Sequence, residues 1–102
     1  LQHAFAAHVE EVESDDGLLP QLLADAPRVA NGVHRMEREH VTITDDLDAA
    51  ARLVASCGGE CGTDTVEAIR EAVVDVLRAI SRHRQKGADL VYEAYNVDIG
   101  GG

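Results

Sequence analysis

The fold of this chain is decided by its last long segment, VEAIREAVVDVLRAISRHRQKGADLVYEA, which spans residues 66–94. Apolar residues recur along it in steps of three and four, the spacing that places side chains on one face of an α-helix. We therefore predict a helix from about residue 64 to about residue 97, with the tail DIGGG (98–102) frayed. The apolar face of this helix comprises Val66, Ile69, Val73, Val76, Ile80, His83, Gly87, Leu90 and Ala94.

A second long helix is predicted upstream, from about residue 28 to about residue 55, by the same alternation of steps. The Gly-rich stretch SCGGECG (56–62) ends it. Two long helices joined by a short loop are expected to pack as an antiparallel hairpin. The apolar face of this upstream helix comprises Val29, Val33, Met36, His40, Ile43 and Leu47.

The N-terminal part of the chain carries a shorter helical pattern over residues 1–14. Residues 17–27 then predict a turn followed by one or two short helical turns before Pro27. The apolar face of the N-terminal helix comprises Leu1, Phe5, His8 and Val12.

Together these patterns predict a single domain over residues 1–102 with an all-α fold, because the chain is well below the size at which a core divides. We expect an antiparallel up-and-down four-helix bundle, of which three main helices lie in this sequence. The sequence begins at Leu1, inside a helical pattern. We therefore expect the fourth helix to come from an upstream segment or from a second copy in a homodimer.

Acidic residues outnumber basic residues by 19 to 9, and the formal net charge is −10. Such a charge repels phosphate backbones and anionic lipid headgroups, so we expect neither nucleic acid nor a membrane surface as a partner. No apolar run approaches the roughly 20 residues of a membrane-spanning helix, and no targeting segment is evident at the N-terminus. A cytoplasmic location is expected.

The two cysteines, Cys57 and Cys61, lie in the Gly-rich loop with three residues between them. No second pair of cysteines or histidines follows nearby to complete a tetrahedral zinc site. We therefore expect either a small local disulfide or two free thiols.

Three of the five histidines, His8, His40 and His83, stand on the apolar faces, one on each main predicted helix. His3 and His34 lie off these faces. A single core histidine is ordinarily satisfied by a carbonyl or a carboxylate, but three imidazoles on facing helices are costly to bury unless a common ligand collects them. The pattern predicts that the three histidines share one cavity, where imidazole nitrogen and carboxylate oxygen would suit iron or manganese.

Three segments resemble the hemerythrin-like (HHE cation-binding) domains, in particular a divergent bacterial subset: FAAHVEEVE (5–13), MEREHVTI (36–43) and HRQKGADLVYEAY (83–95). The resemblance extends from Phe5 to Gly101 and omits the first helix of that family. It implies a helical bundle with a non-haem di-iron centre that binds or senses dioxygen, peroxide or nitric oxide. Iron is the implied metal, and manganese and zinc are the alternatives.

The resemblance also implies which residues would hold the metal. Glu13 stands one place beyond the bridging carboxylate of the family's second helix, and we expect it to substitute for that group. Glu93 is the expected acidic ligand of the last helix, in competition with Asp89 and Tyr92. The complete set of implied metal ligands is His8, Glu13, His40, His83 and Glu93.

Four positions that hold ligands in the family are apolar here, namely Val12, Met36, Gly87 and Ala88. They support an alternative, a degenerate hemerythrin-like domain without metal that acts as a helical interaction or dimerisation module. The sequence has no nucleophile elbow, Gly-rich phosphate loop or Cys/His pair, so a conventional hydrolase or transferase is the weakest interpretation. The sequence does not choose between reversible ligand binding and peroxide turnover.

Overall fold

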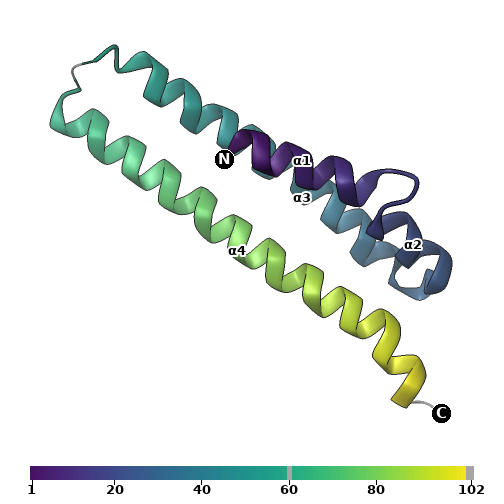
Figure 1. Ribbon diagram of the computed structural model, residues 1–102. Coiled ribbons are helices and arrows are strands. Elements are labelled where there is room, and N and C mark those ends of the chain that lie inside the picture. Colours follow the sequence, from purple (N-terminus) through teal and green to yellow (C-terminus); the bar gives the residue numbers. More distant parts are fainter. Residues whose placement is uncertain (60, 101–102) are drawn as a thin grey trace.

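The computed structural model describes residues 1–59 and 61–100, in which helices are joined by short turns and no strand occurs (Figure 1). This confirms the all-α prediction. The helices begin and end close to the places where the sequence pattern predicts. They are α1 (Gln2–Glu13), α2 (Leu18–Asp25), the short 3-10 helix η1 (Pro27–Val29), α3 (Ala30–Ser56) and α4 (Thr63–Gly100).

The last helix continues to Gly100, about three residues beyond the predicted end. Contacts with the α2–η1 region fix the turn of α4 just before this extension. The Tyr95 hydroxyl donates a hydrogen bond to Asp25 (2.9 Å). The Arg28 guanidinium donates to the carbonyl oxygens of Glu93 (3.2 Å) and Ala94 (2.7 Å). Anchoring of the preceding turn therefore favours continuation of the helix. The fraying predicted at residues 101–102 lies outside the described residues.

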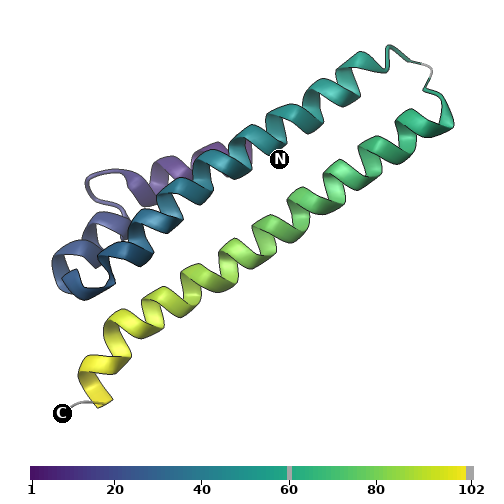
Figure 2. The same cartoon turned by 180° about the vertical axis from the view of Figure 1, so that it is seen from behind.

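The two long helices, α3 and α4, run antiparallel as the arms of a hairpin, and the molecule is elongated, with extents of 61 × 24 × 17 Å (Figure 1). Helix α1 lies antiparallel along the middle of α3, and α2 fills the open end of the hairpin (Figures 1 and 2). The start of α1 is tied to the middle of α3, where Gln2 Nε2 donates to Asp48 Oδ1 (2.6 Å). The predicted hairpin is confirmed, with α1 beside it and the short α2 at its open end, but the described residues do not form a four-helix bundle.

The first part of the core surrounds α2 at the open end of the hairpin. Leu22 and Val33 are fully buried there. Gly32 lets α4 come close, because a Cβ atom at this position would lie only 2.5 Å from Cδ1 of Leu90. The buried residues of this cluster are Leu19, Leu22, Ala26, Val29, Val33, Met36, Leu90 and Ala94.

A second core cluster lies where α1 packs on the hairpin, and it consists of Phe5, Ile43, Leu47 and Val76. Between the two clusters lie His40 and His83, which are 2% and 5% exposed. His40 falls between Met36 of the first cluster and Ile43 of the second on the same face of α3. The histidines therefore divide an otherwise aliphatic core.

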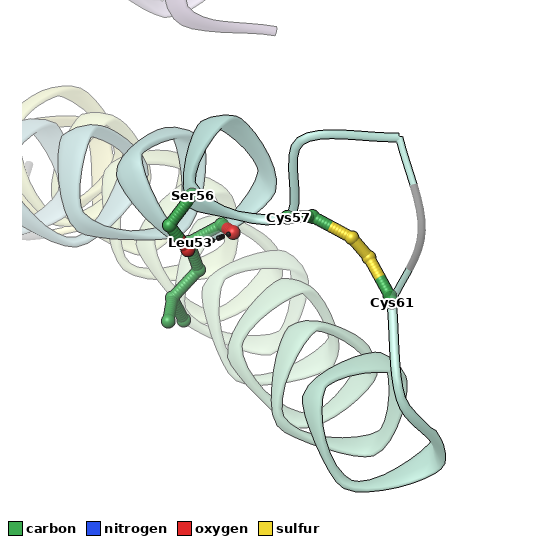
Figure 3. The surroundings of a disulfide bond; sticks show 4 residues. All are labelled: Leu53, Ser56, Cys57 and Cys61. Atoms are coloured by element: carbon green, nitrogen blue, oxygen red, sulfur yellow. Dashed lines mark hydrogen bonds between the residues drawn. A yellow bond between two sulfur atoms is a disulfide. The ribbon is translucent and has the colours of Figure 1, made fainter.

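The tip of the hairpin is closed by a disulfide between Cys57 and Cys61, which is the first of the two alternatives that the sequence left open (Figure 3). Gly58 and Gly59 turn the chain with φ angles of 62° and 103°, a left-handed region that side chains disfavour. The end of α3 is tightened by the Ser56 hydroxyl, which donates to the Leu53 carbonyl (2.8 Å; Figure 3).

The half of the hairpin nearer this tip extends past α1 and keeps part of its apolar surface in solvent (Figure 1). None of the described helices combines the length and the apolar character that a bilayer-spanning segment needs. The large apolar residues that α3 and α4 expose in this half are Leu53, Val54, Val66 and Leu77.

The burial of α2 can be tested with a matched pair of leucines. Replacing Leu22, which is 0% exposed, by Ala should lower the free energy of unfolding by roughly 2–5 kcal/mol, because it removes buried methyl groups and leaves a cavity. Replacing Leu77, which is 49% exposed, by Ala should change it by about 0.5 kcal/mol or less. Urea denaturation followed by far-ultraviolet circular dichroism measures both. Equal effects would contradict the described core.

Candidate metal centre

Three histidines from three helices meet at one point: His8 from α1, His40 from α3 and His83 from α4. Each offers a ring nitrogen, and these atoms all lie within 4.8 Å of one another. The ring centroids of His40 and His83 are 4.7 Å apart, and that of His8 lies 5.4 Å from the first and 5.9 Å from the second. The convergence predicted from the apolar faces is therefore present.

The cluster is placed by the packing of the helices around Phe5. Its ring lies 5.9 Å from the rings of both His8 and His40 and 6.3 Å from that of His83. Two of these contacts, to His40 and His83, are edge-on. The buried phenyl ring therefore closes the cluster on the side of the second core cluster. His8, by contrast, is exposed.

Two carboxylates support the buried histidines from outside the cluster. Nδ1 of His40 is hydrogen-bonded to Oε2 of Glu13 on α1 (2.6 Å). Nδ1 of His83 is hydrogen-bonded to Oε1 of Glu39 on α3 (3.0 Å), and the second oxygen of Glu39 accepts a hydrogen bond from Lys86 Nζ (2.9 Å). Each buried histidine is therefore held by a carboxylate from another helix: the His40 ring on α3 by a residue of α1, and the His83 ring on α4 by a residue of α3.

The other ring nitrogen, Nε2, of His40 and of His83 has no hydrogen-bond partner among the described residues. Every fully buried side-chain nitrogen or oxygen in the described part of the chain has a partner, and the two Nε2 atoms have none. Neither Nε2 atom is therefore fully buried. Buried histidines with one satisfied and one open nitrogen are well placed to bind a ligand.

The three histidines line a pocket of about 320 Å³ that is surrounded by side chains of α1, α2, α3 and α4. Among the described residues that line it, Arg84 is the only charged side chain apart from the three histidines. The wall of the pocket is therefore mostly aliphatic. The other residues that line it are Val12, Leu18, Leu19, Leu22, Met36, Gly87, Ala88, Leu90 and Val91.

Partial burial and the neighbouring charges shift the pKa values of two groups, His8 and Glu39. Burial lowers the pKa of His8 below 6.5, and the neighbouring His40 and His83 lower it further, while Glu11 and Glu13 offset part of the effect.

For the second group, Glu39, burial raises the pKa. The hydrogen bonds and charges of Lys86 and His83 outweigh burial, however, and leave the pKa of Glu39 below its usual value. The carboxyl is therefore ionised at neutral pH and available as an acceptor.

The acidic ligands expected from the sequence are not gathered with the histidines. Glu13 is hydrogen-bonded to Nδ1 of His40 and does not line the pocket that the three histidines share. Glu93 lies ten residues beyond His83, which is roughly 15 Å along a helix, so its exposed side chain cannot join the cluster. Asp89 accepts a hydrogen bond from Gln85, and Tyr92 is 67% exposed.

Glu39 is the residue whose place at the site was not predicted. The sequence shows it one position before His40, on a neighbouring face of α3, but not that this face meets His83. The other signal in the sequence is Lys86, which lies one helical turn after His83. A lysine there favours a carboxylate close to both side chains. His34, predicted to lie off the site, is hydrogen-bonded to Glu37 at the surface (3.2 Å).

Comparison of the chain with protein-family models, with curated proteins and with solved structures finds no match. No comparison therefore identifies a hemerythrin-like domain, and what this site binds has to be argued from its own geometry.

The donor set fits a metal ion. Imidazole suits iron, zinc, copper and nickel, and two nitrogens on one tetrahedral metal lie about 3.4 Å apart. The donor atoms here lie within 4.8 Å of one another, so a modest rotation of the side chains would bring them to binding distance. The ordinary alternative is a pair of core histidines whose Nδ1 atoms are satisfied by carboxylates and whose Nε2 atoms are satisfied by water.

The shifted pKa of His8 predicts how stability depends on pH in the metal-free protein. Because the folded-state pKa lies below the unfolded value of 6.5, the unfolded chain binds more protons between the two values. Stability is therefore fully present above 6.5 and falls as the pH drops below it. In the variant His8→Gln, the loss of unfolding free energy between about pH 7 and about pH 5 should be smaller. Chemical denaturation at several pH values measures this, and an equal or larger loss would contradict the shift.

Proposed function

We propose that this chain is a hemerythrin-like metal-binding protein that holds non-haem iron through His8, His40 and His83. One observation carries the proposal: three imidazoles from three separate helices have donor atoms within 4.8 Å of one another. The local resemblance of the helices around these residues to hemerythrin-like domains supports iron as the metal. Zinc is an alternative because imidazole also suits it, and manganese would be the alternative if a carboxylate joined the three histidines.

The pocket beside the histidines supports a small ligand. A metal held by three protein ligands keeps coordination positions open. Iron would bind dioxygen, peroxide or nitric oxide at such a position and would supply the redox chemistry. The pocket of about 320 Å³ is large enough for any of them. Its mostly aliphatic wall limits the entry of water, which favours reversible binding or sensing over peroxide turnover.

The resemblance implies two irons, whereas the donors brought together here are sufficient for one. Glu13 and Glu39 are engaged with Nδ1 atoms, and Glu93 is remote, so no carboxylate stands between two metal positions among the described residues. A second iron would require Glu13 to leave His40 or a ligand from another chain segment. One metal per chain is therefore the number that the donors support best.

A second candidate function is supported by the exposed apolar side chains of the hairpin tip. A further helix, or a second copy of the chain, would cover them and complete a four-helix bundle. A degenerate domain would serve as such an interaction module without any metal. The cytoplasmic location stays a prediction, and the Cys57–Cys61 disulfide weighs against it because cytosolic thiols are normally kept reduced.

Metal analysis tests the proposal directly. The protein purified from iron-supplied cells should contain about one iron per chain, measured by elemental mass spectrometry, since three imidazoles form one site. Replacing His83 by Ala should lower the iron content sharply while far-ultraviolet circular dichroism shows little change in helix content. The aliphatic face of α4 on either side of His83 remains, so the helices should still form.

The control is His34→Ala, which removes a surface histidine outside the cluster and should leave the iron content unchanged. Less than about a tenth of an equivalent of iron, manganese or zinc after reconstitution, relative to a complete three-ligand site, would contradict the proposal. That result would leave the interaction module as the function to pursue.

A further inference from the structure

Each of the two buried histidines has one ring nitrogen bonded to a carboxylate and one ring nitrogen without a partner among the described residues. We propose that Glu13 and Glu39 are positioning residues, which hold His40 and His83 with the proton on Nδ1 and thereby present both Nε2 lone pairs to the pocket. The metal part of this inference rests on the proposed function, whereas the placement of the protons does not.

The placement of the protons follows from donor and acceptor chemistry. An ionised carboxylate only accepts hydrogen bonds, so a ring nitrogen bonded to it has to carry the proton. Nδ1 of His40 lies 2.6 Å from Glu13, and Nδ1 of His83 lies 3.0 Å from Glu39. In a neutral imidazole the other nitrogen then has no proton and carries a lone pair.

Glu39 is restrained at both oxygens. Oε1 accepts from His83 and Oε2 accepts from Lys86, whose ammonium group lies 2.9 Å away. The carboxylate is less exposed than Lys86, at 27% against 58% of the side chain. It is therefore held in one orientation by a cation at its outer edge, and the imidazole at its inner edge is oriented with it.

On each ring, Nε2 is the nitrogen that no carboxylate occupies. Nε2 lies across the ring from the Nδ1 side, both rings line the pocket, and their centroids are 4.7 Å apart. A metal ligated by Nε2 gains when Nδ1–H donates to a carboxylate, because the ring becomes more basic and stays oriented. Glu13 therefore acts on the metal through His40 and is not itself a ligand, which revises the role expected from the sequence.

His8 provides an internal comparison. It offers a nitrogen to the same cluster, yet it is exposed and has no hydrogen-bond partner among the described residues. Its proton is therefore free to occupy either nitrogen. We infer that α3 and α4 present two preorganised ligands and that α1 adds a third, adaptable one.

The proton positions can be read by nitrogen-15 NMR of the histidine rings in the full metal-free chain, at a pH where imidazole is neutral. His40 and His83 should each show a proton on Nδ1 and none on Nε2, whereas His8 should show a mixture. In Glu39→Ala, His83 should lose its preference for the Nδ1 proton, and in Glu13→Ala, His40 should lose it. A dominant Nε2 proton on either histidine in the unmodified protein would overturn the proposal.

The matched control is Glu37→Ala, which removes a carboxylate of the same helix from the surface histidine His34 and should leave His40 and His83 unchanged. Glu39→Gln keeps a carbonyl acceptor for Nδ1–H and should retain the His83 proton position even if the Ala variant folds poorly. Loss of the preference in the Glu37 variant, or retention of it in well-folded Ala variants at both sites, would contradict the assignment of these carboxylates.

Calorimetric titration with Zn²⁺ provides the second measurement, since this ion binds imidazole without redox change. The unmodified chain should bind one ion, and Glu13→Ala and Glu39→Ala should each weaken binding by about 10- to 100-fold, while Glu37→Ala should not. Unchanged affinity in both Ala variants would overturn the positioning role. Nδ1 protons in the expected places with no binding of Zn²⁺ or Fe²⁺ would instead support the positioning of the rings and refute the proposed metal function.

Discussion

The arrangement of this molecule depends on the burial of two imidazole rings in an aliphatic core. A buried polar group costs free energy unless a partner satisfies it, and His40 and His83 are almost completely removed from solvent. Each ring is satisfied on one side by a carboxylate from another helix. These two contacts tie α1 to α3 and α3 to α4 at the same level, so they specify how the three helices are placed relative to one another.

The apolar clusters on either side allow the core to contain this polar layer. The cluster around Leu22 and Val33 and the cluster around Phe5 supply most of the aliphatic burial, one toward each end of the region that α1 covers. Local features that break the rules of core packing are typical of functional sites and are stabilised by their surroundings. The Nε2 atoms without protein partners, on rings that line an aliphatic pocket, are such a feature and are the basis for the proposed metal site.

The acidic residues of this chain therefore divide into two kinds of role. Glu13 and Glu39 lie against the buried histidines, whereas Glu93 and Asp89 lie farther along α4, away from the cluster. In a di-iron centre of the kind implied by the resemblance, carboxylates would bridge the metals. Here the nearest carboxylates are hydrogen-bonded to imidazole nitrogens instead, which fits the proposed site for a single metal.

Local periodicity in the sequence was sufficient to determine the helices, most of their apolar faces and the meeting of His8, His40 and His83, whereas Leu1 and Val66 of the predicted faces are exposed. An apolar face has to be buried, and residues on it are carried inward together. The partners of those histidines were decided only by the tertiary structure. Whether Glu39 meets His83 depends on the rotation and register of α3 against α4, and no repeat within one helix encodes either. The closing disulfide was likewise decided by the loop conformation that brings Cys57 and Cys61 together, since their spacing in the sequence also allows free thiols.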